Sequence, residues 1–172
     1  MMPRGYGQLL LPANPWFIAL TLLAALAWHL LPLGRQPGLP DLMAVVLVFW
    51  NVHQPRRVGM GLAFAFGLLM DVAEASLLGQ HALAYTLMAF AAGRMQRRLM
   101  SFGVLEQAVQ VLPVFVAGTL AALLVRLASG GQFPGWWLLA APLLQTLLWP
   151  PASVVLLAPQ RRPPDPDKHR PL

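Results

Sequence analysis

The sequence from Val58 to Leu83, VGMGLAFAFGLLMDVAEASLLGQHAL, decides which fold this chain can adopt. Within it, small or short side chains recur at every fourth position: Gly59, Ala63, Gly67 and Asp71. On a helix this spacing forms one narrow ridge with little side-chain bulk, which another helix can approach closely. The stretch therefore predicts a tightly packed helix that carries a carboxylate at the end of its contact ridge.

The two acids of this stretch lie in unusual surroundings. Asp71 falls inside an apolar run of membrane length, and Glu74 follows one helical turn later. An acidic side chain in such a run is costly, so it is by default a functional candidate. Two interpretations stay open: the ridge and Asp71 serve internal packing and hydrogen bonding, or they receive a partner or a ligand.

The composition indicates a membrane protein. Of 172 residues, 58% are hydrophobic and only 10% are charged, whereas charged residues make up about 25% of a soluble domain. The apolar residues come in blocks that approach the roughly 20 residues of a membrane-spanning helix. We predict an all-α, polytopic fold with one transmembrane domain over residues 1–158 and a disordered cytoplasmic tail over residues 159–172.

Six spans are predicted, at about 15–33, 40–53, 58–75, 81–96, 103–127 and 136–157. The second is short for a span, so it is thinly matched to the bilayer, extended by its flanks or buried among other helices. Asp41, at its start, is predicted to cap the helix. Pro150 and Pro151 are predicted to break the last helix, which then continues at an angle.

The charges lie between the apolar blocks, which argues against nucleic-acid binding despite the net charge of +6. With six spans, ten basic residues fall on one side: Arg4, Arg56, Arg57, Arg94, Arg97, Arg98, Arg161, Arg162, Lys168 and Arg170. Only Arg35 and Arg126 fall on the other side. This bias predicts that both termini are cytoplasmic, with Asp71 in the outer half of the membrane. The arginines at 56, 57, 94, 97 and 98 are predicted to form a basic edge at the lipid headgroups.

The sequence carries no pattern of a catalytic or cofactor-binding site. Its four histidines lack metal-ligand spacing, and the motifs of zinc proteases, serine hydrolases and phosphate-binding loops do not occur. The chain has no cysteine. We therefore predict a protein that is not an enzyme and needs no cofactor or metal.

Several short motifs, in order, resemble one known family. They are Pro40-Asp41, Trp50, Pro55, Arg57-Val58-Gly59, Gly67-Leu68-Leu69-Met70-Asp71, Leu78-Gly79-Gln80-His81-Ala82-Leu83 and Trp149-Pro150. Together they are similar to the rod shape-determining protein family MreD, as are the length and the hydropathy. Glu74 is a departure, because an apolar or small residue is the ordinary one there.

The resemblance implies a non-catalytic inner-membrane scaffold or regulator of cell elongation and lateral peptidoglycan synthesis. It implies association with MreC and, through it, MreB, in an assembly that contains RodA and its transpeptidase partner. It also implies a fold similar to the substrate-binding subunits of energy-coupling-factor transporters. The candidate docking or intramembrane polar residues are Gly59, Ala63, Gly67, Asp71, Glu74, Gly79 and Asp41.

Two alternatives remain at this point. The ridge could accept the single transmembrane helix of MreC, with Asp71 as a hydrogen-bond acceptor. Alternatively, the chain could be a vitamin-binding subunit of a transporter, with Asp71, Glu74, Gln107 and Gln110 as polar groups of a cavity. The scaffold is favoured mostly by the family resemblance, and the two glutamines and the two acids also lie near opposite faces of the membrane. Association into a homodimer is left open.

Overall fold

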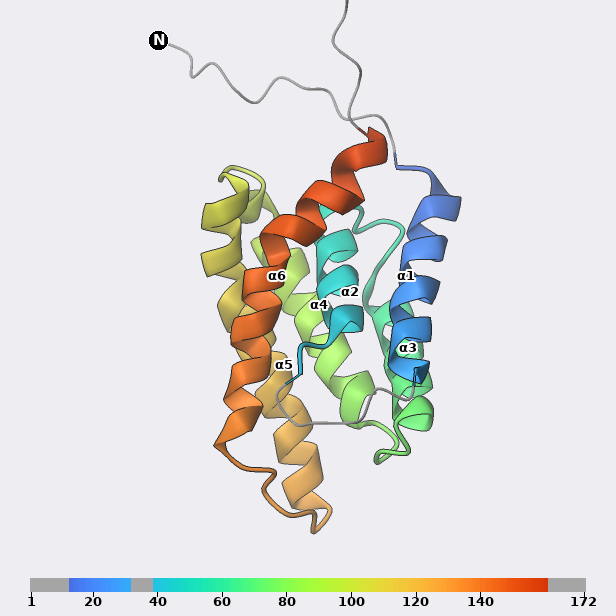
Figure 1. Ribbon diagram of the computed structural model, residues 1–172, viewed down its shortest axis with the longest axis vertical. Coiled ribbons are helices and arrows are strands. Elements are labelled where there is room, and N and C mark those ends of the chain that lie inside the picture. Colours follow the sequence, from blue (N-terminus) through green and yellow to red (C-terminus); the bar gives the residue numbers. More distant parts are fainter. Residues whose placement is uncertain (1–12, 32–38, 161–172) are drawn as a thin grey trace, which may run out of the picture.

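The computed structural model describes residues 13–31 and 39–160, and these residues form helices and no strand. The elements are α1 (Pro15–Leu30), α2 (Leu42–His53), α3 (Met60–Ala73), α4 (Gln80–Leu99), α5 (Val104–Ala128), the 3-10 helix η1 (Trp136–Leu139), α6 (Ala140–Leu157) and the 3-10 helix η2 (Ala158–Gln160). Successive helices run up and down one bundle, so α1 begins at the end where α6 finishes (Figure 1). The all-helical prediction is confirmed for the described residues.

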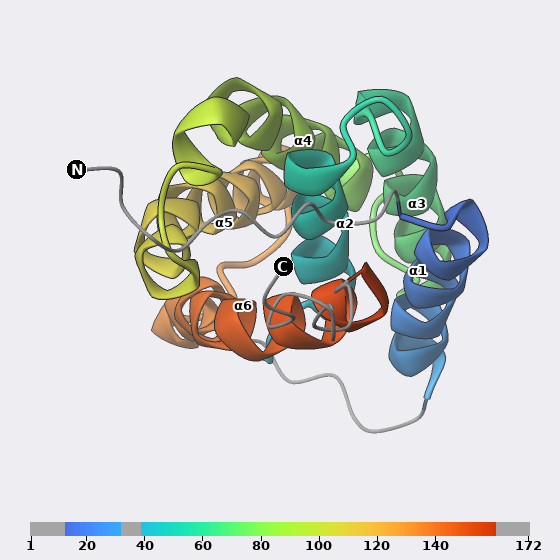
Figure 2. The ribbon, with the colours of Figure 1, turned by 90° about the horizontal axis from the view of Figure 1, so that it is seen from above.

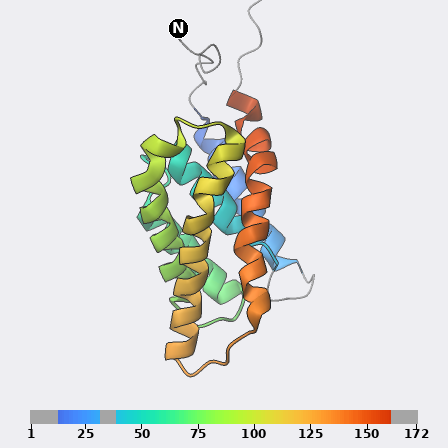
Figure 3. The ribbon, with the colours of Figure 1, turned by 90° about the vertical axis from the view of Figure 1, so that its left-hand side faces the viewer.

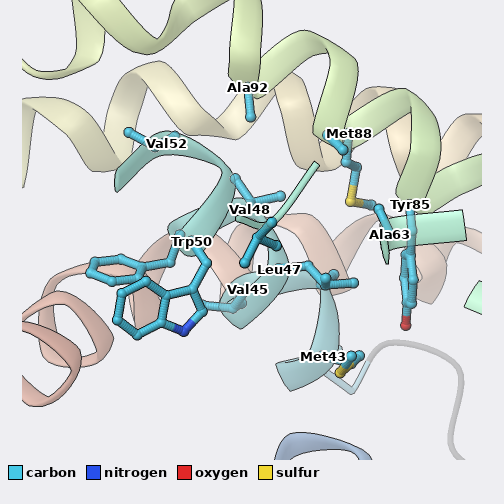
Figure 4. Packing of buried hydrophobic residues seen from close by; sticks show 14 of the residues in the cluster. Met43, Val45, Leu47, Val48, Trp50, Val52, Ala63, Tyr85, Met88 and Ala92 are labelled. Carbon is cyan, nitrogen blue, oxygen red and sulfur yellow. The ribbon is translucent and has the colours of Figure 1, made fainter. Parts of the chain in front are cut away.

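The short α2 lies in the middle of the bundle. Seen from above, the other helices surround it (Figure 2). Nearly all of its side chains are buried, including Phe49 and Trp50, which are fully covered. Figure 4 shows Val48 and Leu47 of this helix among Ala63 of α3 and Met88 of α4. Of the three explanations for the shortness of this apolar block, burial among other helices is therefore the one observed.

The helix starts follow local sequence signals. The Asn14 side chain accepts a hydrogen bond from the N–H of Trp16 at 3.0 Å and caps α1. The Asp41 carboxylate accepts one from the N–H of Ala44 at 3.0 Å and caps α2, as predicted. Gly79 precedes α4 with a φ of +102°, a left-handed conformation that favours glycine.

The two prolines in α6 do not end the helix, contrary to the prediction of a break. α6 is continuous from Ala140 to Leu157 with Pro150 and Pro151 inside it, and its last turns lean away from the axis of the first (Figure 1). The buried Trp149 beside them anchors this part of α6 in the core, and such packing can hold a helix together across a proline kink. Gln160, expected in the disordered tail, is instead buried in η2; residues 161–172 lie outside the described part.

Two helical segments are long and apolar enough to cross a membrane by themselves, Val104–Ala128 and Trp136–Gln160. Figure 3 shows them side by side along the long axis of the bundle. α1, α2 and α3 are apolar but shorter. The outer surface is nonetheless apolar on helix after helix, with Trp16, Val72, Leu105 and Leu147 each more than two-thirds exposed.

Candidate functional site: a polar cluster joining four helices

Six polar side chains meet at the end of the bundle opposite the start of α1. We call them the polar cluster: His29, Asp41, Asp71, Glu74, His81 and Tyr85. They come from the last turn of α1, the cap of α2, the end of α3 and the first turns of α4. Because neighbouring helices are antiparallel, these ends coincide, and residues far apart in the sequence come within hydrogen-bond distance.

Asp71 is the most enclosed member, with 1% of its surface exposed. One carboxylate oxygen, Oδ2, accepts hydrogen bonds from the backbone N–H groups of Gly79 at 2.7 Å and Ala82 at 3.4 Å. The other, Oδ1, accepts from the N–H of His81 at 2.8 Å and from the Ser76 hydroxyl at 3.0 Å. Asp71 thus caps α4 from outside that helix and supplies the acceptors that its glycine N-cap lacks.

Glu74 lies between the two histidines. Its carboxylate is 3.6 Å from Nε2 of His81 and 3.5 Å from Nδ1 of His29. Nδ1 of His81 lies 2.9 Å from Asp71 Oδ1, so this ring bridges two acids of α3. The side chain of Glu74 is 27% exposed, which makes it the most open of the three acids.

Asp41 extends the cluster to α2 and α4. Nε2 of His29 lies 3.2 Å from Asp41 Oδ1, and the Tyr85 hydroxyl donates to Asp41 Oδ2 at 2.5 Å. The contacts therefore run without interruption from α1 through the cap of α2 to α4 and back to α3. Three acids, two imidazoles and a phenol therefore lie within ion-pair or hydrogen-bond distance of one another in an otherwise apolar bundle, as most buried polar groups do.

The ridge of small residues is a contact surface within the chain. Ala63 is completely buried. A Cβ added to Gly67 would lie 2.3 Å from Cα of Ala82, so the backbone of α4 already occupies that space. Gly59 lies at the N-cap of α3. Of the two interpretations left open, internal packing describes the ridge at Gly67, where α4 is the helix that packs.

Asp41 caps α2, Asp71 and Glu74 lie at the end of α3, and Gly79 lies in the turn before α4. The sequence singles out these four residues. It does not single out the other three members of the cluster, His29, His81 and Tyr85. A signal was available in the predicted topology. The end of the first apolar block and the start of the fourth fall on the same side, so polar residues there were candidates to meet. The spacing of the histidines in the sequence shows no metal-ligand pattern and gives no sign of their contacts with acids. Residues 13–31 and 39–160 contain no group of three or more ligands arranged to hold a metal ion.

The two glutamines weighed for a ligand cavity lie apart from the cluster. Gln107 donates to the carbonyl of Phe102 at 3.0 Å and accepts from Nε1 of Trp149 at 3.4 Å. It therefore fixes α6 against the start of α5, at the other end of the bundle. No contact joins Gln107 or Gln110 to Asp71 or Glu74 among the described side chains.

The basic residues gather at the end of the bundle away from the cluster. Five arginines there are exposed: Arg56, Arg57, Arg94, Arg97 and Arg98. Arg57 donates to the carbonyl of Ala13 at 2.9 Å, and the Arg94 guanidinium lies 5.0 Å from the centre of the Phe90 ring. We call this the basic end. Arg126, near the end of α5, lies at the opposite end.

An apolar exterior around a cluster of paired polar side chains indicates an all-helical membrane protein. The comparison with known proteins gives the family: the model of the rod shape-determining protein MreD matches residues 8–157, so the chain belongs to that family. It is 27% identical over 119 residues to the rod shape-determining protein MreD of Haemophilus influenzae, covering 69% of this chain and 74% of that protein. No solved structure matches the chain. The family is one of membrane proteins that take part in determining rod cell shape.

Proposed function

We propose that this chain is a non-catalytic scaffold of the cell-elongation machinery in the bacterial inner membrane. In this proposal it crosses the membrane six times, keeps both termini in the cytoplasm and docks MreC. It would thereby support lateral peptidoglycan synthesis by RodA and its transpeptidase partner, and connect indirectly to MreB. Membership of the MreD family supports the role in rod shape; the partners and the topology are the proposal's own.

The observation that carries the proposal is how polarity is distributed. Large apolar side chains are exposed on every α-helix except the buried α2, as on Trp16, Val72, Leu105 and Leu147. The acids at one end of the bundle contact histidine and tyrosine side chains in the polar cluster. A protein built in this way offers its neighbours a surface for contact within the bilayer, where close packing drives association.

The six-span topology is supported by charge and by the position of α2. The basic end carries five arginines against Arg126 at the other end, and cytoplasmic loops are enriched in lysine and arginine. α2 is enclosed by other helices, so it need not match the full thickness of the bilayer. The polar cluster would then lie toward the outer face. A fold similar to the substrate-binding subunits of energy-coupling-factor transporters is part of this proposal.

Docking of MreC would use the outer apolar faces, since α4 already covers the ridge of Ala63 and Gly67. α5 and α6, the two helices of spanning length, expose Leu105, Val109, Leu124, Leu143 and Leu147. The same faces are available for a homodimer. RodA and the transpeptidase would join through MreC or through these faces.

The test is gentle purification of the tagged chain from its native membrane, followed by mass spectrometry of the proteins that accompany it. Recovery of MreC, with or without RodA and its transpeptidase, is expected. The matched control is an unrelated tagged inner-membrane protein of similar abundance, which should recover none of them. Recovery of an ATPase pair or of a stoichiometric vitamin-like molecule in place of MreC would overturn the scaffold in favour of a transporter subunit.

A further inference from the structure

An apolar groove runs between α1 and α3 and begins at the basic end. Its volume is about 530 Å³, within the roughly 300–1,000 Å³ of sites that hold small molecules. Ile18, Ala19 and Leu22 form one wall, and Leu62 and Phe66 form the other. The groove opens on the outer, apolar surface of the bundle, where hydrocarbon is the surrounding solvent in a membrane.

Arg57 lines the same groove, next to Pro15 and Val58 at its basic end. One of its guanidinium nitrogens donates to the carbonyl of Ala13 at 2.9 Å, which holds the side chain at the start of α1. No carboxylate of the described residues pairs with Arg57. Its remaining N–H groups and its charge are therefore available to an anion at the mouth of the groove, and guanidinium binds phosphate well.

The length of the groove and the charge at its mouth fit one lipid chain with an anionic headgroup. The α1 wall extends from Pro15 to Leu23, about 12 Å at 1.5 Å per residue. That length is well short of the roughly 30 Å of hydrocarbon core that the spanning helix of a partner would cross. A single acyl chain is narrower than a helix about 10 Å across and would cover the apolar walls along this length.

We propose that this groove binds an anionic phospholipid of the leaflet at the basic end. One acyl chain lies between α1 and α3, and the phosphate contacts Arg57. Bound in this way, the lipid fills the space between α1 and the rest of the bundle. The inference goes beyond the scaffold role, because it concerns lipid recognition by this chain alone and does not depend on MreC.

The test uses the full chain, purified in detergent, delipidated and titrated with phosphatidylglycerol or phosphatidylethanolamine under native mass spectrometry. We expect the first phosphatidylglycerol to bind more tightly than phosphatidylethanolamine. Arg57→Gln should weaken that binding about tenfold, as expected for the loss of a charge-assisted hydrogen bond. Arg98→Gln, which removes the same charge elsewhere at the basic end, is the matched control and should leave it unchanged.

A second pair of variants tests the groove itself. Ala19 is exposed and lines the groove, whereas Ala24 is exposed on α1 and does not line it. Ala19→Trp should fill the groove and abolish the preferred site, and Ala24→Trp should not. The proposal is overturned if both phospholipids bind equally, if Arg57→Gln behaves as Arg98→Gln does, or if Ala19→Trp retains the lipid. Thermal unfolding of all four variants reports whether each is folded.

Discussion

The backbone N–H of Gly79 donates a hydrogen bond to the carboxylate of Asp71 across 2.7 Å, so the end of α3 determines where α4 begins. The conformation of Gly79, with a φ of +102°, turns the chain so that the N–H of His81 reaches the same carboxylate at 2.8 Å. A carboxylate placed at the start of a helix satisfies free N–H groups and interacts favourably with the helix dipole. The Asp71 carboxylate therefore joins two helices of this chain.

Replacing Asp71 should destabilise the protein in a graded way. Asp71→Ala leaves the N–H groups of Gly79 and His81 without acceptors, at about 1–3 kcal/mol for each buried donor. Asp71→Asn keeps one acceptor oxygen and should lose roughly half as much. Thermal unfolding in detergent, monitored by tryptophan fluorescence, measures the order of stability of the unchanged protein, Asp71→Asn and Asp71→Ala. Glu106→Ala is the control, because Glu106 caps α5 on an exposed surface and should cost about 1 kcal/mol.

The same variants distinguish stability from partner binding. If Asp71→Asn purifies folded and still recovers MreC and rod shape, the negative charge has no role beyond capping. If Asp71→Ala unfolds at the temperature of the unchanged protein, the capping role assigned to Asp71 is wrong.

Gly67→Ala should be strongly destabilising. The added Cβ would meet Cα of Ala82 at 2.3 Å and its nitrogen at 2.6 Å, and backbone atoms cannot move aside as a flexible side chain can. Overpacking of this kind costs about 1–3 kcal/mol or more. Gly61→Ala on the exposed side of the same helix meets nothing within 4 Å, and it should be neutral or stabilising by up to about 1 kcal/mol.

Unfolding measurements on these two glycine variants also bear on the ridge. If MreC no longer co-purifies with the Gly67→Ala variant, this result bears on docking only when the variant is shown to be folded. Equal stability of Gly67→Ala and Gly61→Ala would contradict the close approach of α3 and α4.

His29 and Asp41 should be energetically coupled. Their side chains lie 3.2 Å apart and join α1 to α2. In a double-mutant cycle of His29→Gln and Asp41→Asn, we expect a coupling of about 0.5–3 kcal/mol in the free energy of unfolding. Glu106 lies in the first turn of α5, at the end of the bundle away from the cluster. In the cycle of His29→Gln with Glu106→Ala, the two changes in the free energy of unfolding should therefore add within about 0.5 kcal/mol. If the effects of His29→Gln and Asp41→Asn on the free energy of unfolding also add, His29 does not interact with Asp41 and is not part of the cluster.

The helices could be predicted from the sequence because the signals are local. The apolar blocks, the breakers between them and the cap at Asp41 depend on neighbouring residues only, and the helices lie close to the predicted blocks. The ridge at Gly67 predicts a close helix contact, but it leaves open whether the contacting helix belongs to this chain or to a partner. Small residues show that some helix approaches, and the next helix in the chain is the one that is nearest.

The polar cluster could be predicted only in part, because packing creates it. His29 and Asp41 are separated by a connecting segment, and His81 lies two helices further along the chain, so no sequence spacing marks them as a group. The prolines at 150 and 151 do not break α6, although its last turns lean away from the first (Figure 1). The adjacent Trp149 is buried and contacts Gln107 of α5, a tertiary contact that no local signal reveals.

The proposed topology makes a prediction that two serines test. Ser101 lies in the turn between α4 and α5 at the basic end, and Ser129 follows α5 at the other end; both are exposed. The chain has no cysteine, so Ser101→Cys and Ser129→Cys each introduce a single thiol. In cells whose outer membrane has been permeabilised, a membrane-impermeant maleimide should label Ser129→Cys, because the end with fewer basic residues faces outward. Ser101→Cys should react only after the inner membrane is opened, and detergent-solubilised samples of both variants control for accessibility.

If Ser101→Cys is labelled first, the orientation is the reverse of the proposed one and the polar cluster lies toward the cytoplasm. If both variants are labelled while the inner membrane is intact, the result contradicts a bundle that spans the bilayer.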